Sequence, residues 1–316
     1  MASESPVVIY GAIAANVAIA VTKFVVAGIT GSSAMLSEGI HSAVDTGNGV
    51  LLLVGTRLSE RPANETHPFG HGKELYFWSL IVAVLIFGIG GGVSFYEGVM
   101  HVRQPKPLED AMWSYVVLGA AACFEGTSFA IALRAFLKEA NGRPFWKALH
   151  GSKDPTTYTV LAEDSAALLG LAVAALGVYA SHRLDLPVLD GVASIVIGLL
   201  LAGVAVLLVR ESRGLLIGEG IRPDTAAEVR RIVRAQTGVK AVSGPLSMYI
   251  GREEVLLVLD VEFEDGTPAQ RVAETVATIE RLVRERFPVI RRIYIEARKL
   301  SPNEPAQRAP ASALDE

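Results

Sequence analysis

Long apolar runs alternate with short polar segments over the first two thirds of the chain. A helix that crosses a bilayer takes about 20 mostly apolar residues, and each run is that long. Because backbone polar groups inside a membrane must be satisfied within their own segment, the runs predict helices. We expect six of them, at Val7–Ile29, Ala34–Gly55, Phe77–Met100, Ala111–Phe136, Tyr158–Ser181 and Val188–Val209.

The pattern changes after residue 210, where shorter amphipathic segments follow one another. Helical and alternating apolar periods are the main signals that separate helices from strands. They predict a helix opening at Pro223, strands at Leu246–Ile250 and Val255–Phe263, a helix at Pro268–Arg286 and a last strand at Arg292–Ala297. The order αββαβ predicts a compact α+β domain of ferredoxin-like type.

Composition supports a division into two parts. The chain has 316 residues, of which 51% are hydrophobic, and its mean hydropathy of +0.38 is too high for an ordinary soluble protein. Residues 1–210 carry 13 Lys/Arg and 16 Asp/Glu, whereas the much shorter stretch 211–316 carries 16 and 17. We predict a polytopic α-helical membrane protein, with a six-helix transmembrane domain at 1–210, a cytoplasmic domain at 211–300 and a disordered tail at 301–316.

The charged residues also bear on orientation and partners. Short loops rich in Lys and Arg face the cytoplasm. Such residues follow the second, fourth and sixth helices, while the opposite side has only Arg103, Lys106 and Arg183. Both termini are therefore expected in the cytoplasm, in a cell (inner) membrane, with an organellar membrane left open. The net charge of −4 gives no reason to expect nucleic acid, and the single Cys123 excludes an internal disulfide.

Several charged or titratable side chains fall inside the expected helices. One such charge at a helix centre costs roughly 2.5–3.5 kcal/mol on insertion scales, so these residues are functional candidates by default. They are Lys23, Glu38, His41, Asp45, Glu97, Glu125, Glu163 and Asp164.

The second and fifth helices carry the sharpest clusters. His41 and Asp45 are four residues apart and share one helix face, so together they can supply two ligands to a divalent ion. With Asp164 and Glu163 of the fifth helix they predict a site of one nitrogen and several oxygens, which suits Zn²⁺ but also Mn²⁺, Fe²⁺ or Co²⁺. Two alternatives stay open: a packing hydrogen bond between His41 and Asp45, and a salt bridge between the helix-five acids and Lys23.

A second candidate metal site lies in the loop after the second helix. His67 and His71 are four residues apart with glycines beside them, and Asn64 and Glu65 stand just upstream. Two imidazoles at this spacing suit a transition metal. The alternative is a solvated loop without metal.

Two motifs carry a resemblance to a known family. HPFGHGKELYFWSL at 67–80 and GSSAMLSEGIHSAVD at 31–45, followed by the αββαβ tail, resemble the cation diffusion facilitator family of divalent-metal transporters. The resemblance implies a homodimer joined mainly through its C-terminal domains, which exports metal from the cytoplasm in exchange for protons.

The same resemblance implies roles for single residues. His41, Asp45 and Asp164 match the family's transport ligands, and His67 and His71 match its loop metal site. Val160 stands where the family usually has a fourth ligand, His or Asp, so Glu163 is the expected substitute. The adjacent Glu-Asp pair is similar to the zinc transporter nine-like branch, which makes zinc the expected substrate.

These features predict proton-coupled efflux of a divalent metal, most simply zinc, by alternating access at a site between the second and fifth helices. A membrane metal sensor that binds without net transport is the first alternative. A transporter preferring manganese, iron or cobalt is the second. We expect no enzyme, because the sequence has no convincing nucleophile–base pair, no H-E-x-x-H motif and no phosphate-binding glycine loop.

Overall fold

The structure is a computed structural model that describes residues 6–106, 111–140, 142 and 155–300. By their contacts the residues divide into two compact units, and each is described by itself. The first unit contains residues 1–58 and 74–213, and the second contains residues 59–73 together with the chain from Gly214 onward. The sequence predicts the boundary at residue 210 and places loop 59–73 with the membrane helices, whereas by contacts that loop belongs to the C-terminal unit.

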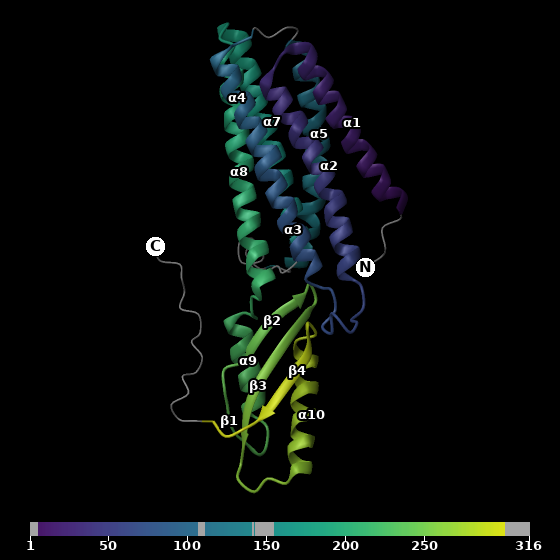
Figure 1. Cartoon of the computed structure of the whole chain (residues 1–316), viewed down its shortest axis with the longest axis vertical. Coiled ribbons are helices and arrows are strands. Elements are labelled where there is room, and N and C mark those ends of the chain that lie inside the picture. The colour runs from purple at the N-terminus through teal and green to yellow at the C-terminus, as the bar shows by residue number, and fades with distance from the viewer. Residues whose placement is uncertain (1–5, 107–110, 141, 143–154, 301–316) are drawn as a thin grey trace. The chain divides into compact units, whose positions relative to one another are not determined.

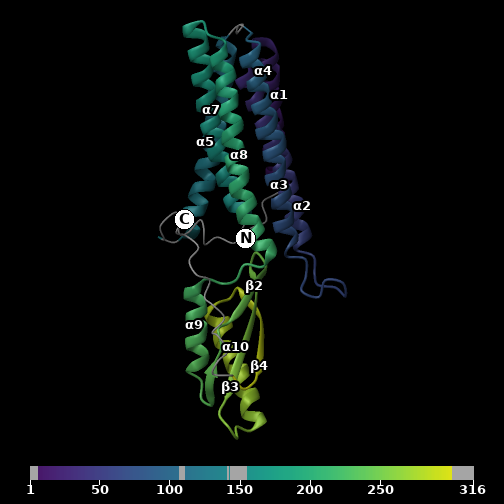
Figure 2. The same cartoon turned by 60° about the vertical axis from the view of Figure 1, so that its left-hand side comes forward.

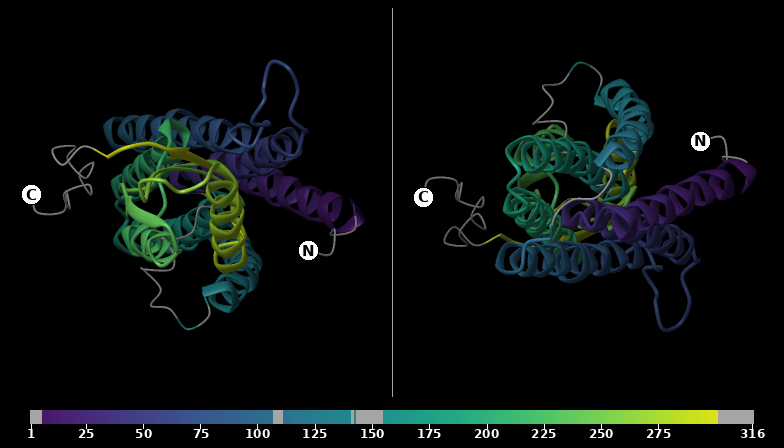
Figure 3. Two further views of the ribbon diagram at one scale, coloured as in Figure 1. Left: turned by 90° about the horizontal axis from the view of Figure 1, so that it is seen from below. Right: turned by 90° about the horizontal axis from the view of Figure 1, so that it is seen from above.

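The first unit is a bundle of long helices (Figures 1 and 2). Three short segments, α3, η1 and α4, run on as one continuous helix, in which η1 has π-helical geometry. Figure 3 shows the bundle end-on, with α1 diverging from its neighbours toward the N-terminus. The bounds are α1 Pro6–Thr30, α2 Ser33–Ser59, α3 Glu74–Leu85, η1 Ile86–Val93, α4 Ser94–Arg103, α5 Ala111–Ala140, α7 Pro155–Leu184 and α8 Val188–Ile217.

The expected membrane character is confirmed in its coarse form. Within the described residues, four segments are long and apolar enough to cross a bilayer, namely Glu74–Arg103, Met112–Lys138, Tyr158–Leu184 and Val188–Ile217. A shorter apolar segment, Asn16–Thr30, lies within α1. The total of six spans stays a prediction.

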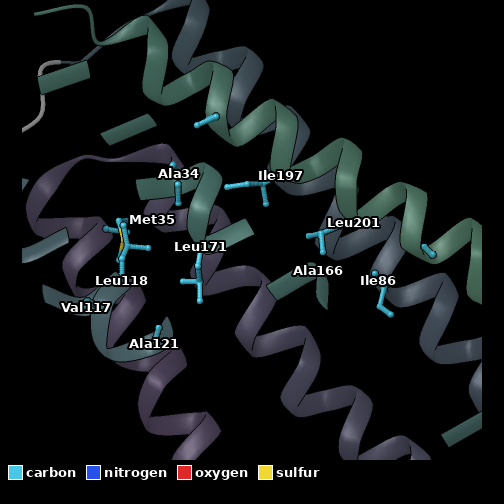
Figure 4. Packing of buried hydrophobic residues seen from close by; sticks show 14 of the residues in the cluster. Ala34, Met35, Ile86, Val117, Leu118, Ala121, Ala166, Leu171, Ile197 and Leu201 are labelled. Carbon is cyan, nitrogen blue, oxygen red and sulfur yellow. The ribbon is translucent and has the colours of Figure 1, made fainter. Parts of the chain in front are cut away.

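The interior of the bundle is filled by apolar side chains from most of its helices. Met35 of α2, Leu118 of α5 and Leu171 of α7 belong to one buried cluster, which continues to Ile197 and Leu201 of α8. Figure 4 shows these side chains gathered between the helices. The cluster holds α2 and α7, the two helices that carry the candidate ligands, in one packed body.

Glycines let the η1–α4 segment approach α8 closely. A Cβ atom on Gly98 would lie 2.6 Å from the Ile195 nitrogen, and one on Gly198 would lie 2.6 Å from the Phe95 nitrogen. Lipid provides no hydrophobic drive for helix association, so close backbone packing of this kind supplies much of the attraction.

The N-terminus of α2 is fixed by a carboxylate from another helix. Asp190, in the first turn of α8, is fully buried. Its Oδ2 accepts hydrogen bonds from the Ser33 nitrogen (2.6 Å), the Ser33 hydroxyl (3.0 Å) and the Ala34 nitrogen (3.3 Å), and its Oδ1 accepts one from the Ser32 hydroxyl (2.6 Å). His101 of α4 places Nε2 3.9 Å from Oδ2. A negative charge at this end also complements the helix dipole.

The second unit is a four-stranded sheet covered on one face by two helices. Strand β3 is central. Strands β1 and β2 pair antiparallel along one edge of it, and β4 pairs parallel along the other. Val255, Leu257, Leu259 and Val261 alternate along β3 and pack on the helices. The elements are α9 Pro223–Arg234, β1 Val239–Val242, β2 Leu246–Gly251, β3 Glu254–Phe263, α10 Ala269–Arg286 and β4 Ile290–Ala297.

The expected order αββαβ is wrong by one element, because β1 precedes β2. Strand β1 has four residues, and only Val242 is fully buried. So short a segment gives almost no period-two signal. It becomes a strand because Val239 and Val242 pair with Phe263 and Val261 at the far end of β3. The predicted tail at 301–316 lies outside the described residues.

Replacing Asp190 by alanine should destabilise the bundle. The Asp190→Ala change would leave two backbone N–H groups and two hydroxyls of the α1–α2 connection without their acceptor. Buried donors left unsatisfied in this way should cost about 3 kcal/mol. Thermal unfolding of the detergent-solubilised chain measures the loss. Asp190→Asn keeps one acceptor oxygen and should lose less; equal melting temperatures for both variants and the parent would contradict the anchoring role.

Alanine at Gly198 should weaken the packing of α8. The added methyl group would overlap the Phe95 backbone, and overpacking of this kind typically costs about 1–3 kcal/mol. Gly203→Ala, in the same helix, is the matched control because a Cβ there meets nothing within 4 Å. Gly198→Ala should lower the melting temperature while Gly203→Ala leaves it unchanged or raises it. The same shift in both would show that helix propensity, not close packing, governs these sites.

Candidate functional site

The His41–Asp45 pair lies on one buried face of α2. His41 Nε2 and Asp45 Oδ2 are 3.4 Å apart. His41 Nε2 and Asp45 Oδ1 are buried and have no hydrogen-bond partner among the described residues. The alternative of a packing hydrogen bond between the two side chains is therefore not formed in this structure. One nitrogen and one oxygen that could each bind a metal thus lie on successive turns of α2, and neither has a hydrogen-bond partner among the described residues.

The two adjacent acids of α7 reach different helices. Glu163 Oε1 accepts a hydrogen bond from Asn48 Nδ2 of α2 at 2.8 Å. Asp164 Oδ2 accepts one from the Ser128 hydroxyl of α5 at 3.1 Å. Successive residues on a helix point about 100° apart, which explains the divergence. Glu163 thereby joins α7 to α2, and Asp164 joins α7 to α5.

Carboxyl groups collect around Asp45 without forming a coordination shell. Its carboxylate lies within electrostatic reach of Glu163, Glu125 and Asp164. Within the described ranges, however, no three His, Cys, Asp or Glu side chains stand close enough together to hold one metal ion. The site of His41, Asp45, Glu163 and Asp164 thus stays a prediction, and metal binding would require Glu163 and Asp164 to exchange their present partners for the ion.

Lys23 is not the partner of the α7 acids. Its Nζ donates to Glu38 Oε2 at 3.0 Å and to the Ser42 hydroxyl at 2.8 Å. The alternative of a salt bridge between Lys23 and the helix-five pair is therefore wrong for the described side chains. The lysine instead joins α1 to α2, beside His41.

Loop 59–73 brings its two histidines together. The rings of His67 and His71 have centroids 4.4 Å apart. Asn64, just upstream, organises the turn, because its Oδ1 accepts hydrogen bonds from the His67 nitrogen at 2.7 Å and from the Thr66 hydroxyl at 2.9 Å. His71 Nδ1 is buried and has no hydrogen-bond partner in the described part of the chain. A metal bound by His67 and His71 stays a prediction.

The same loop is fastened to the sheet of the C-terminal unit. The Arg292 guanidinium lies 5.3 Å from the centre of the Phe69 ring and donates to the Pro68 carbonyl. Arg292 is itself held by Glu254 at 2.7 Å. The loop also needs glycine at position 72, because a Cβ there would overlap the Ile250 carbonyl oxygen.

Asp190 and His101 are two buried titratable residues that the sequence analysis missed. Asp190 directly follows a helix-opening Pro-Val-Leu segment, so it is explained locally as an acid in the first turn of its own helix. His101 is in the last turn of α4, where a basic residue is also unremarkable. The contact between them depends on the packing of α4 against α8, which no local pattern indicates.

Comparisons with known proteins agree with this architecture. Residues 9–217 match the cation efflux transmembrane domain. The chain is 33% identical over 237 residues to the mitochondrial proton-coupled zinc antiporter SLC30A9 of Xenopus laevis, covering 74% of this chain and 42% of that protein. It is 32% identical over 244 residues to the human protein of that name, covering 77% and 43%.

A plant relative extends the range of similar proteins. Metal tolerance protein C4 of Arabidopsis thaliana is 32% identical over 243 residues, covering 76% of this chain and 53% of the relative. The chain therefore spans about half or less of the length of these relatives. The family match takes in two thirds of the chain and confirms the resemblance drawn from the two motifs, so the chain belongs to the cation efflux family.

Proposed function

We propose that this chain carries a divalent metal cation, zinc in the first place, across a membrane in exchange for protons. The observation that supports this proposal most directly is a pair of buried ligand atoms, His41 Nε2 and Asp45 Oδ1, neither of which has a hydrogen-bond partner among the described residues. A buried polar atom without a partner costs free energy, and a cation supplies the missing interaction. The relatives named as proton-coupled zinc antiporters support the choice of ion and counter-ion.

Metal would be held between α2 and α7. His41 and Asp45 supply a nitrogen and an oxygen from α2, and Asp164 and Glu163 supply oxygens from α7. Val160 leaves the position one turn before Asp164 without a ligand atom, which gives Glu163 its place in the set. To coordinate metal, Glu163 releases Asn48 and Asp164 releases Ser128. These hydrogen bonds occupy the two carboxylates while the site is empty.

Protons and metal compete for the same groups. A metal ligand must be deprotonated, so binding of the ion on one side expels protons and reprotonation on the other side releases it. His41 belongs to the residue type whose ordinary titration range is nearest neutrality. Alternating access of one site to the two sides of the membrane then gives exchange.

The remaining expectations complete the proposal. The chain works as a homodimer joined through its C-terminal domains, with six membrane helices and both termini in the cytoplasm of a cell (inner) membrane. A second metal is bound by His67 and His71 in the loop of the C-terminal unit. The basic loops support cytoplasmic termini. The paired imidazoles of His67 and His71 support the second metal.

Transport should depend on one acid from each helix. In proteoliposomes with an imposed pH gradient, Asp45→Asn and Asp164→Asn should each lower zinc flux at least about tenfold, because each removes a charged ligand of the ion. Uptake of Zn²⁺, Mn²⁺, Co²⁺ and Fe²⁺ by the parent chain measures selectivity. Asp224→Asn, on an exposed turn of α9, is the matched control and should transport as the parent does.

Three outcomes would change the proposal. Full flux in both Asp45→Asn and Asp164→Asn would place the transported ion elsewhere. Flux that ignores the pH gradient would remove proton exchange. Binding of metal by a folded parent chain that moves none across the membrane would favour a metal sensor.

The loop should account for one of two bound metals. The double variant His67→Ala/His71→Ala should bind one zinc fewer per chain than the parent, as counted by equilibrium dialysis and metal analysis. The loop should keep its place, because Phe69, Arg292 and Gly72 are untouched. An unchanged zinc count would assign the two histidines to ring packing alone.

A further inference from the structure

Lys23 and Glu38 form a fully buried ion pair between α1 and α2. Neither side chain has any exposed surface, and Nζ lies 3.0 Å from Oε2. Removing two charges from water costs several kcal/mol for each ion, and apolar side chains of similar volume are often equally stabilising. Stability alone therefore does not account for this pair.

The lysine stands close to the candidate ligands. Its second hydrogen bond, 2.8 Å long, goes to the hydroxyl of Ser42, the residue directly after His41. Its positive charge acts on both His41 and Asp45, and also on Glu125 of α5. Lys23 is thus the cationic member of a group made up chiefly of carboxylates.

Glu38 holds the other end of the pair in a fixed place. Its Oε1 has no hydrogen-bond partner among the described residues, and a Cβ on Gly170 of α7 would lie 2.5 Å from that oxygen. Glycine at position 170 therefore makes room for the carboxylate. The pair lies among α1, α2 and α7, and its ammonium group is bonded to the residue next to His41.

We propose that Lys23 is a tethered counter-cation, a positioning residue that limits how tightly the site between α2 and α7 holds a divalent metal. This inference rests on the proposed function. In the empty site the ammonium group offsets part of the carboxylate charge. In the filled site it repels the dication, which keeps the ion exchangeable. In general, a unit charge at about 10 Å from a dication, at an effective dielectric constant of about 20, changes a dissociation constant by tenfold or more, and here the Glu38 carboxylate 3.0 Å from the ammonium nitrogen offsets part of that effect.

Three variants of the full chain separate this role from a structural one. Lys23→Met/Glu38→Gln removes both charges with little change of volume. Glu38→Gln leaves the ammonium group charged but without its carboxylate. Lys23→Arg keeps the positive charge and is the matched control. The measurements are the zinc dissociation constant in detergent, the KM and maximal rate of flux in proteoliposomes, and the melting temperature.

The two charge-removing variants should move zinc binding in opposite directions. Lys23→Met/Glu38→Gln should bind zinc a few-fold more tightly and turn over more slowly, because the repulsion by the ammonium group, which the Glu38 carboxylate offsets only in part, is gone. Glu38→Gln should bind zinc more weakly, because no carboxylate then offsets the positive charge. Lys23→Arg should stay close to the parent. If the double variant fails to fold, the direction of the change in Glu38→Gln still decides the question.

A purely structural pair would give a different result. Zinc dissociation constants equal to the parent value, with lower melting temperatures, would overturn the counter-cation role while leaving the proposed function intact. Weaker binding in the double variant would also overturn it. A parent chain that neither binds nor moves zinc would overturn the proposed function, and this inference with it.

Discussion

Burial of charge among apolar helices is the constraint on which the rest of this molecule depends. A carboxylate or ammonium group inside a bundle must find a partner or leave an uncompensated penalty. Helix α2 meets this constraint at several levels: Asp190 binds its N-terminus, Lys23 pairs with Glu38, and Asn48 holds Glu163 of α7. His41 Nε2 and Asp45 Oδ1 remain unpartnered within the described residues, and an incoming cation is the natural complement to them.

Polar and apolar contacts hold α2 in place although two of its polar atoms lack hydrogen-bond partners among the described residues. Asp190 ties the start of the helix to α8, and the apolar cluster around Met35 packs it on α5 and α7. The carboxylates of Glu163 and Asp164 accept hydrogen bonds from Asn48 and Ser128, which are neutral side chains. Each of the two carboxylates is thus held by a single neutral side chain.

The C-terminal unit is stabilised mainly by apolar packing rather than by buried polar contacts. Its sheet owes its stability to alternating apolar residues of β3 beneath α9 and α10. Loop 59–73, which joins α2 to α3, belongs to the same unit and is fastened there by Arg292, Phe69 and Gly72. The loop histidines are therefore held by the C-terminal sheet, although the loop connects two helices of the first unit, α2 and α3.

The sequence by itself determined the helical membrane domain, the α+β tail and the list of candidate ligands. Each of these depends on local composition, short periods or the spacing of His41 and Asp45. Tertiary structure alone decided that Lys23 pairs with Glu38 and not with the α7 acids, that Asp190 caps a helix other than its own, and that strand β1 exists beside β3. The physical reason is the same in each case. A buried charge or a short strand pairs with whichever group the packing brings close to it in space. The number of residues between the two along the chain does not indicate that contact.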